Sequence, residues 1–115
     1  GGATVVTTRL MASGDLLRPN DSLTTADGTH RLVYQLDGNL VLYRIGGGAV
    51  TSSGTVGTTP GIAVMQGDGN FVVYDAAGVP RFNTVTHGNP GAELHFEAGR
   101  LHIIAPSGTR LWSSP

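Results

Sequence analysis

The chain has no cysteine, which excludes a disulfide framework, thiol catalysis and cysteine-ligated zinc. No run of the sequence approaches the roughly 20 apolar residues that a membrane-spanning helix needs, so we expect no membrane insertion. The 7 basic and 8 acidic side chains leave a net charge of -1. This charge provides no broad attraction to nucleic acid or to anionic lipid. Recognition by this protein must therefore rest on something other than charge.

Helical periodicity is also missing. Of the 115 residues, 18 are glycine, and glycine costs about 1 kcal/mol at each interior helical position. Short alternating or β-branched runs instead lie between Gly, Asp, Asn and Pro. We therefore expect an all-β protein. Residues 1–115 should form one domain, because a chain of this length buries roughly 65% of the surface that it exposes when unfolded.

What the sequence does contain is a duplicated motif. Gln35–Tyr43 reads QLDGNLVLY, and Gln66–Tyr74 reads QGDGNFVVY, 31 residues later (66 − 35). Gln, Asp, Asn, Val and Tyr recur at the same positions in both copies. The spacing divides the chain into repeats over roughly residues 30–60, 61–90 and 91–115, preceded by N-terminal strands.

Each motif predicts a β-hairpin, because Asp-Gly between two β-rich runs is a strong turn signal. If the loop spans residues 37–39, alternation along the strands gives the hairpin two distinct faces. The predicted outer faces comprise Gln35, Val41 and Tyr43 in the first repeat and Gln66, Val72 and Tyr74 in the second. The predicted inner faces comprise Leu36, Leu40 and Leu42, and Phe71 and Val73.

A third copy of the motif is recognisable from the turn that follows it, Ala105–Gly108, and from Leu111–Ser113. This alignment places Phe96 opposite Gln66. The apolar spacing persists, but the polar residues are gone, so we expect the third site to be degenerate. The motif positions in this copy hold Phe96, Ala98, Arg100, His102 and Ile104.

The residue types of the two intact motifs favour binding of a sugar. Gln, Asp, Asn and Tyr together supply hydrogen-bond donors and acceptors, and neighbouring sugar hydroxyls need this mixture. Val41 and Val72 would add an apolar floor for one face of a pyranose ring. Hydrolysis of a glycosidic bond ordinarily needs two carboxylates about 5 to 10 Å apart, whereas each motif has one. The pattern therefore predicts binding without catalysis.

Other chemical functions find little support. The sequence has no nucleophile-elbow motif, and the glycine run Gly46–Gly48 has no phosphate-loop lysine nearby. Trp112 aligns with Phe82 and Thr51 in the other repeats, which favours core filling along an axis. We expect no catalytic residue, no metal and no cofactor. Four histidines lack a local zinc-ligand spacing: His30, His87, His95 and His102.

The two motifs resemble Gln-x-Asp-x-Asn-x-Val-x-Tyr, the signature of the bulb-type mannose-binding lectins of monocot plants, the snowdrop-agglutinin family. The resemblance extends upstream through Leu10 and Asp21–Leu23 and downstream to Leu111–Ser113. It implies the β-prism II fold, in which three four-stranded sheets surround a pseudo-threefold axis. Each sheet in that fold offers one potential sugar site.

The resemblance also implies a role for each motif residue. Asp37 and Asn39 would contact the axial 2-hydroxyl of mannose, Gln35 would contact O3 and Tyr43 would contact O4, while Val41 would supply the apolar contact. The second site would use the equivalent residues in the same roles. The implied sites are Gln35, Asp37, Asn39, Val41 and Tyr43, and Gln66, Asp68, Asn70, Val72 and Tyr74.

Several alternatives stay open at this stage. An Asp-Gly-Asn stretch alone is often only a turn, and a decayed lectin would keep part of its motif. The protein is expected to be a free-standing lectin, or the targeting module of a larger enzyme or toxin, or a lectin-fold domain that contacts protein. Members of the family commonly carry a disulfide and exchange C-terminal strands between protomers. Because this chain has no cysteine, a homodimer is possible here but is not implied. We expect a secreted protein.

Overall fold

The computed structural model describes residues 8–115, so the predicted start of the domain at residue 1 lies outside the described residues. Residues 8–115 contain strands and turns but no helix, and hence no apolar helix that could span a membrane. The strands are β1 (Arg9–Met11), β2 (Leu16–Leu17), β3 (Ser22–Thr24), β4 (His30–Tyr34), β5 (Leu40–Arg44), β6 (Ala49–Ser52), β7 (Pro60–Met65), β8 (Phe71–Asp75), β9 (Pro80–Asn83), β10 (Glu93–Glu97), β11 (Arg100–Ile104) and β12 (Arg110–Ser113).

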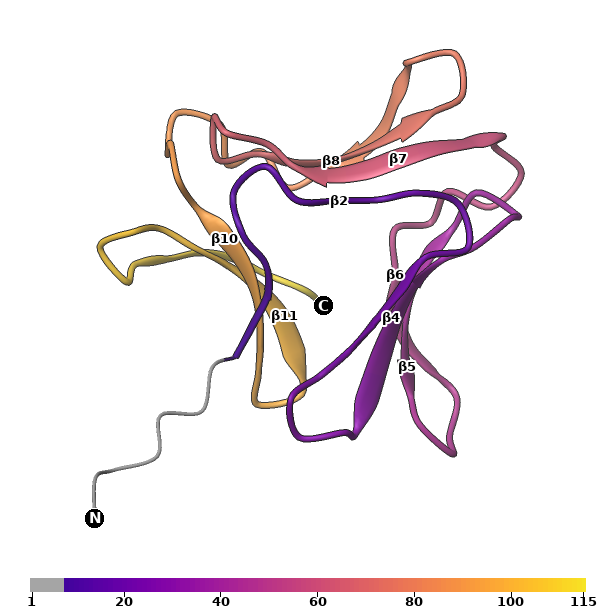
Figure 1. The fold of residues 1–115 in the computed structure, drawn as a ribbon, viewed down its shortest axis with the longest axis horizontal. Helices are drawn as coiled ribbons and strands as arrows, with labels where there is room; N and C mark the ends of the chain where they lie inside the picture. The colour runs from indigo at the N-terminus through magenta and orange to yellow at the C-terminus, as the bar shows by residue number, and fades with distance from the viewer. Residues whose placement is uncertain (1–7) are drawn as a thin grey trace.

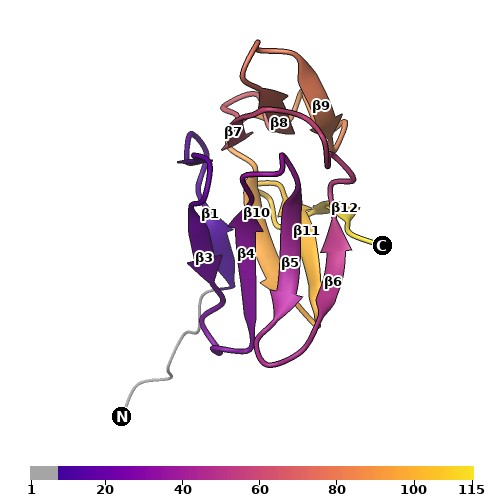
Figure 2. The same cartoon turned by 90° about the vertical axis from the view of Figure 1, so that its right-hand side faces the viewer.

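The strands form three antiparallel four-stranded sheets, in the orders β3-β4-β5-β6, β2-β7-β8-β9 and β1-β10-β11-β12. The first three strands are short, and each becomes an edge strand of a different sheet. Each remaining group of three consecutive strands completes one sheet. Figure 1 shows the sheets as the sides of a triangle, and Figure 2 shows the same prism from the side. This arrangement confirms the predicted all-β prism.

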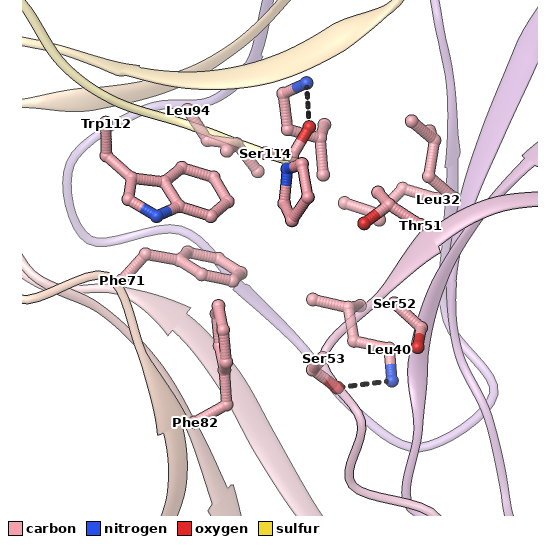
Figure 3. Close-up of a pocket in the computed structure, with 13 residues that line it drawn as sticks. Leu32, Leu40, Thr51, Ser52, Ser53, Phe71, Phe82, Leu94, Trp112 and Ser114 are labelled. Carbon is pink, nitrogen blue, oxygen red and sulfur yellow. Dashed lines mark hydrogen bonds between the residues drawn. The ribbon is translucent and has the colours of Figure 1, made fainter.

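Equivalent positions in the three sheets meet around the axis. Thr51, Phe82 and Trp112 pair with the central strands of their sheets in the same register, opposite Leu42, Val73 and Ile103. Phe82 and Trp112 pack against the buried core, and Figure 3 shows their rings near one another. The predicted alignment of these three positions and their structural role are therefore confirmed.

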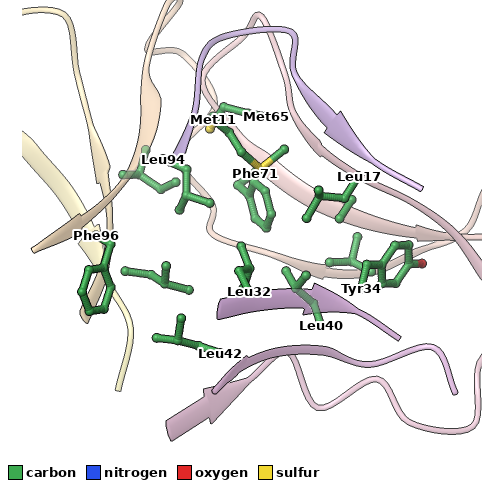
Figure 4. Packing of buried hydrophobic residues seen from close by; sticks show 14 of the residues in the cluster. Met11, Leu17, Leu32, Tyr34, Leu40, Leu42, Met65, Phe71, Leu94 and Phe96 are labelled. Atoms are coloured by element: carbon green, nitrogen blue, oxygen red, sulfur yellow. The ribbon is translucent and has the colours of Figure 1, made fainter. Parts of the chain in front are cut away.

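The inner faces of the sheets make up the core (Figure 4). The predicted inward residues Leu40, Leu42, Phe71 and Val73 are all buried, and full burial of such a side chain stabilises the fold by roughly 1.5–3 kcal/mol. The prediction for Leu36 was wrong, because this residue lies in the turn after β4 and is 69% exposed.

Three hydroxyl groups repeat around the prism and fix the chain where it leaves the last strand of each sheet. Each hydroxyl accepts a hydrogen bond from a backbone N–H on the central strand, at 3.0 to 3.2 Å. The backbone N–H of the same residue donates to the carbonyl of that central residue, at 2.8 to 3.1 Å. The hydroxyl residues and their partners are Ser53 with Leu40, Thr84 with Phe71, and Ser114 with Leu101.

Candidate functional site

The first motif forms the hairpin between β4 and β5. The backbone N–H of Gln35 donates to the carbonyl of Asn39 at 2.8 Å, and that of Gly38 donates to the carbonyl of Gln35 at 3.0 Å. The three-residue loop therefore spans residues 36–38, one residue earlier than predicted. Because a cross-strand pair shares one face of a sheet, Asn39 joins Gln35, Val41 and Tyr43 on the outer face.

The glycine of each motif is required by the local backbone. Gly38 has a φ of 91°, and a Cβ atom there would lie 2.3 Å from the carbonyl oxygen of Thr58. Gly69 has a φ of 94°, and its Cβ would lie 2.2 Å from the carbonyl oxygen of Asn89. Only glycine combines this φ with so close an approach. The hairpin tip therefore packs against the loop that follows in each repeat.

Polar side chains of the first motif form a connected network on the outer face. The Tyr43 hydroxyl donates to Oε1 of Gln35. Nε2 of Gln35 donates to both carboxylate oxygens of Asp37, at 3.2 and 3.1 Å. The backbone N–H of Asn39 donates to Oδ1 of Asp37 at 2.9 Å. These bonds hold three side chains from two strands and a turn in one fixed arrangement.

This network keeps both motif carboxylates ionised. The backbone N–H of Asn39, followed by the side chain of Gln35, lowers the pKa of Asp37 below its ordinary value of 3.8. The backbone N–H of Asn70 is likewise the main cause that lowers the pKa of Asp68. Hydrogen bonds of this kind stabilise the charged form of a carboxyl group. Both groups are therefore hydrogen-bond acceptors at neutral pH.

Asn39 is held from the opposite side, by the segment after β6. Its Oδ1 accepts from Oγ of Ser53 at 3.1 Å and from the backbone N–H of Thr55 at 3.1 Å. Asn39 is 8% exposed, and its Nδ2 group has no hydrogen-bond partner within residues 8–115. The carboxamide is therefore held through its oxygen, and its Nδ2 group is left as a donor.

The second motif repeats this network on the hairpin between β7 and β8. The Tyr74 hydroxyl donates to Oε1 of Gln66 at 2.5 Å, and Nε2 of Gln66 donates to Asp68 at 3.1 and 3.3 Å. The backbone N–H of Asn70 donates to Oδ1 of Asp68 at 2.9 Å. One contact differs, because Nδ2 of Asn70 donates to Oδ1 of Asn83 at 3.4 Å. The second donor is therefore partly occupied within the protein.

Val41 and Val72 lie on the outer faces but are nearly covered. Each is 3% exposed, so little of either side chain reaches the surface. The apolar contact between these valines and a sugar ring stays a prediction, and it would involve only a narrow strip of each side chain.

In the third repeat, the alignment of Phe96 with Gln66 was wrong. Phe96 pairs with Leu101 as Met65 pairs with Phe71, and Phe96 is buried in the core. The residue at the position of Gln66 is Glu97. The cause is a shortened turn, because only residues 98 and 99 separate the paired residues Glu97 and Arg100. Both turn residues have positive φ angles, 51° and 78°, as in a two-residue type I′ hairpin.

The outer face of the third sheet carries a different polar network. Thr8 donates through its hydroxyl to Glu97 at 2.9 Å, and Arg110 contacts the same carboxylate at 3.3 Å. His102, at the position of Val72, is 3% exposed and contacts the Ser113 hydroxyl at 2.7 Å. Glu97 and Arg110 are thus paired with each other. The sequence motif gave no signal for this network, because its members come from separate parts of the chain.

The comparisons agree with this geometry. No family profile matches the chain. B-type lectin plumieribetin of Scorpaena plumieri is 36% identical over 107 residues, covering 90% of this chain and 92% of that protein. A structure from Gastrodia elata, described as a novel monomeric monocot mannose-binding lectin, has a TM-score of 0.78 and 29% identity over 92% of this chain and 96% of its own. A domain-swapped lectin dimer from Mycobacterium smegmatis has a TM-score of 0.53 and 38% identity, covering 88% and 93%.

A prism of three sheets with this sequence similarity defines the class of the protein, a β-prism II carbohydrate-binding fold. Within that class, the chain belongs to the B-type lectins, the bulb-type family in which the monocot mannose-binding lectins also fall.

Proposed function

We propose that this protein is a metal-independent mannose-binding lectin with two sites per chain. The observation that carries the proposal is the paired network on two hairpins, in which Tyr, Gln, Asp and Asn are linked in the same order. Each motif supplies a fixed carboxylate acceptor and, two residues later, an amide donor. A sugar hydroxyl both donates and accepts, so it can satisfy both groups at once.

We assign the contacts of the first site as the family resemblance implies. The carboxylate of Asp37 and Nδ2 of Asn39 bind the axial 2-hydroxyl of mannose, because they are an adjacent acceptor and donor. Gln35 binds O3 and Tyr43 binds O4. The second site uses the equivalent residues, Asp68, Asn70, Gln66 and Tyr74, with Val41 and Val72 as the apolar contacts.

The third face is proposed not to bind mannose. Its shorter turn leaves no position equivalent to Asp68, and the carboxylate of Glu97 is already paired with Arg110 and Thr8. A catalytic role is not proposed for any face. Each mannose site offers a single carboxylate, and its pKa is lowered, whereas a general acid for glycoside hydrolysis needs a raised pKa.

The proposed sites are shallow, and this sets their affinity. A few hydrogen bonds, each with a net value of about 1 kcal/mol, hold a monosaccharide near millimolar, or about −4 kcal/mol. Simultaneous binding of both sites to one glycan would raise the overall affinity roughly 100-fold when the spacing permits. The expected target is therefore a glycan that displays several mannose residues.

Calorimetry and NMR titration with methyl-α-mannoside test the proposal. Unmodified protein should bind two equivalents, whereas Asp37→Ala and Asp68→Ala should each bind one, with at least about a 10-fold loss at the altered site. Asp37→Asn is the milder control, because it keeps an oxygen that can accept from the backbone N–H of Asn39. The double variant should bind none. Two unchanged equivalents in either alanine variant would refute the site assignment.

A glycan array distinguishes this function from a protein-binding role. Selective retention of mannose-terminated glycans by the unmodified protein, lost in the double variant, would support the lectin function. Absence of binding to every glycan, in a protein whose folded state is verified by NMR, would contradict it.

A further inference from the structure

A cavity of about 180 Å³ lies between the three sheets (Figure 3). Residues from all three sheets line it, and its walls are mostly apolar. Exposed Ser52 and Pro115 lie at its rim and give a small molecule access from solvent. The apolar lining includes Leu32, Leu40, Phe71, Phe82, Leu101 and Trp112.

The cavity follows from unequal residues at equivalent positions. Thr51, Phe82 and Trp112 occupy the same register in their three sheets. The rings of Phe82 and Trp112 meet edge to face, with centroids 6.2 Å apart and an interplanar angle of 69°. The third position holds only the small side chain of Thr51, which also lines the cavity. The missing volume therefore corresponds to an aromatic side chain.

Polar groups in the lining offer little to water. The hydroxyl of Ser114 accepts from the backbone N–H of Leu101 at 3.0 Å. The hydroxyl of Ser53 accepts from the backbone N–H of Leu40 at 3.0 Å and donates to Oδ1 of Asn39 at 3.1 Å. Two polar groups of the lining have no hydrogen-bond partner within residues 8–115, the hydroxyl of Thr51 and the indole N–H of Trp112. Ordered water needs two to four polar partners, and an apolar cavity of roughly 150 Å³ stays dry and binds benzene.

We propose that this cavity is a binding site for a small apolar molecule built around a single aromatic ring. The ring of the ligand takes the place of the aromatic side chain that Thr51 replaces, next to Phe82 and Trp112. None of the residues proposed to contact the sugar lines the cavity, but Ser53 of the lining bonds to Asn39 of the first site. The second site is therefore used as the independent readout of mannose binding.

NMR of isotope-labelled protein titrated with benzene tests the proposal. Benzene should shift the indole peak of Trp112 and give intermolecular NOEs to the methyl groups of Thr51 and Leu40. Thr51→Phe should fill the cavity and weaken benzene binding by at least about 10-fold. Thr51→Val, which keeps the size of the side chain and removes its hydroxyl, should bind benzene within about 2-fold of the unmodified protein. Methyl-α-mannoside should still bind the Gln66 site in both variants.

Two results would overturn the proposal. One is the absence of NOEs to Thr51 and Leu40 in the unmodified protein, a measurement that depends on no variant. The other is the filling of the cavity by a second chain, which sedimentation would show as a dimer unaffected by benzene. If Thr51→Phe fails to fold, Thr51→Leu provides a smaller filling group. Unchanged benzene binding in that variant would also contradict the proposal. Loss of mannose binding alone would refute the lectin function and leave this inference intact.

Discussion

The two proposed mannose sites should differ in affinity because of one neighbouring side chain. Ser52 and Asn83 pair with Val41 and Val72 at equivalent positions beside the two sites. Oδ1 of Asn83 accepts from Nδ2 of Asn70 at 3.4 Å. Nδ2 of the equivalent Asn39 has no such partner. An amide nitrogen carries two hydrogens, so Asn83 holds one of the two Nδ2 hydrogens at the second site, whereas neither is held within residues 8–115 at the first.

The distance sets the size of this effect. A neutral hydrogen bond is worth about 1 kcal/mol net, and 3.4 Å lies beyond the usual range of 2.7–3.2 Å for such bonds. We expect the sugar to accept from the hydrogen that Asn83 holds, and breaking this bond should then weaken sugar binding by about 2- to 5-fold. Asn83→Ser should strengthen the second site by this factor, and Ser52→Asn should weaken the first site by the same factor.

The exchange is well matched in structure. Oγ of Ser52 accepts from the backbone N–H of Gly54 at 3.3 Å, and Oδ1 of Asn83 accepts from that of Val85 at 2.8 Å. After either substitution, the new side chain can therefore still accept a hydrogen bond from the backbone of the loop that follows it. NMR titration with methyl-α-mannoside should follow the amide peaks of Asn39 and Asn70 separately. An unchanged dissociation constant at the second site in Asn83→Ser would refute the competition by Asn83.

Two further predictions concern stability. Val85 has a φ of 54° and is 70% exposed, whereas Gly54 holds the equivalent position with a φ of 69°. Such strain costs about 1–3 kcal/mol, so Val85→Gly should raise the free energy of unfolding in urea by about 1 kcal/mol; no rise would contradict the strain. The Thr25 and Thr29 hydroxyls lower the pKa of Asp27 to about 2, so its stabilising effect is complete above the ordinary 3.8 and lost as the pH falls toward about 2. Asp27→Asn should reduce the difference in Tm between about pH 5 and pH 2; an equal difference would exclude this role.

Much of the fold was predictable from the sequence because its signals are local and repeated. The duplicated Asp-Gly turns predict hairpins, and alternation predicts that Leu40 and Leu42 are buried. The same rule failed at Leu36, because the loop begins one residue earlier than the pattern indicates. Moving the loop by one residue shifts every cross-strand partner by two positions, so the strand residues keep their faces. Leu36, however, moves from strand to turn, and alternation does not describe turns.

The third repeat shows a different limit of sequence analysis. Alignment on the downstream turn correctly placed Arg100, His102 and Ile104, which follow the shortened loop. It misplaced Phe96, which precedes the loop. A deletion inside a turn is hard to locate from sequence, because both flanking strands keep their alternation. The role of Asn83 was also missed, since it depends on pairing between separate strands.

The buried apolar positions of each repeat and its outer polar motif have different physical constraints. This difference explains why the polar motif could vary in the third repeat while the fold was kept. The hydroxyls of Ser53, Thr84 and Ser114 bond to the central strand in all three repeats, because each sheet needs this closure. The polar side chains of the motif lie outside the hydrophobic core, so they can change while the core is kept. Substituting Glu97 and Arg100 by Gln and Asn would not rebuild a site, because the two-residue turn between them has no place for the carboxylate. Building the proposed site on the third sheet therefore requires an inserted residue, since the position of the aspartate is set by the length of the turn.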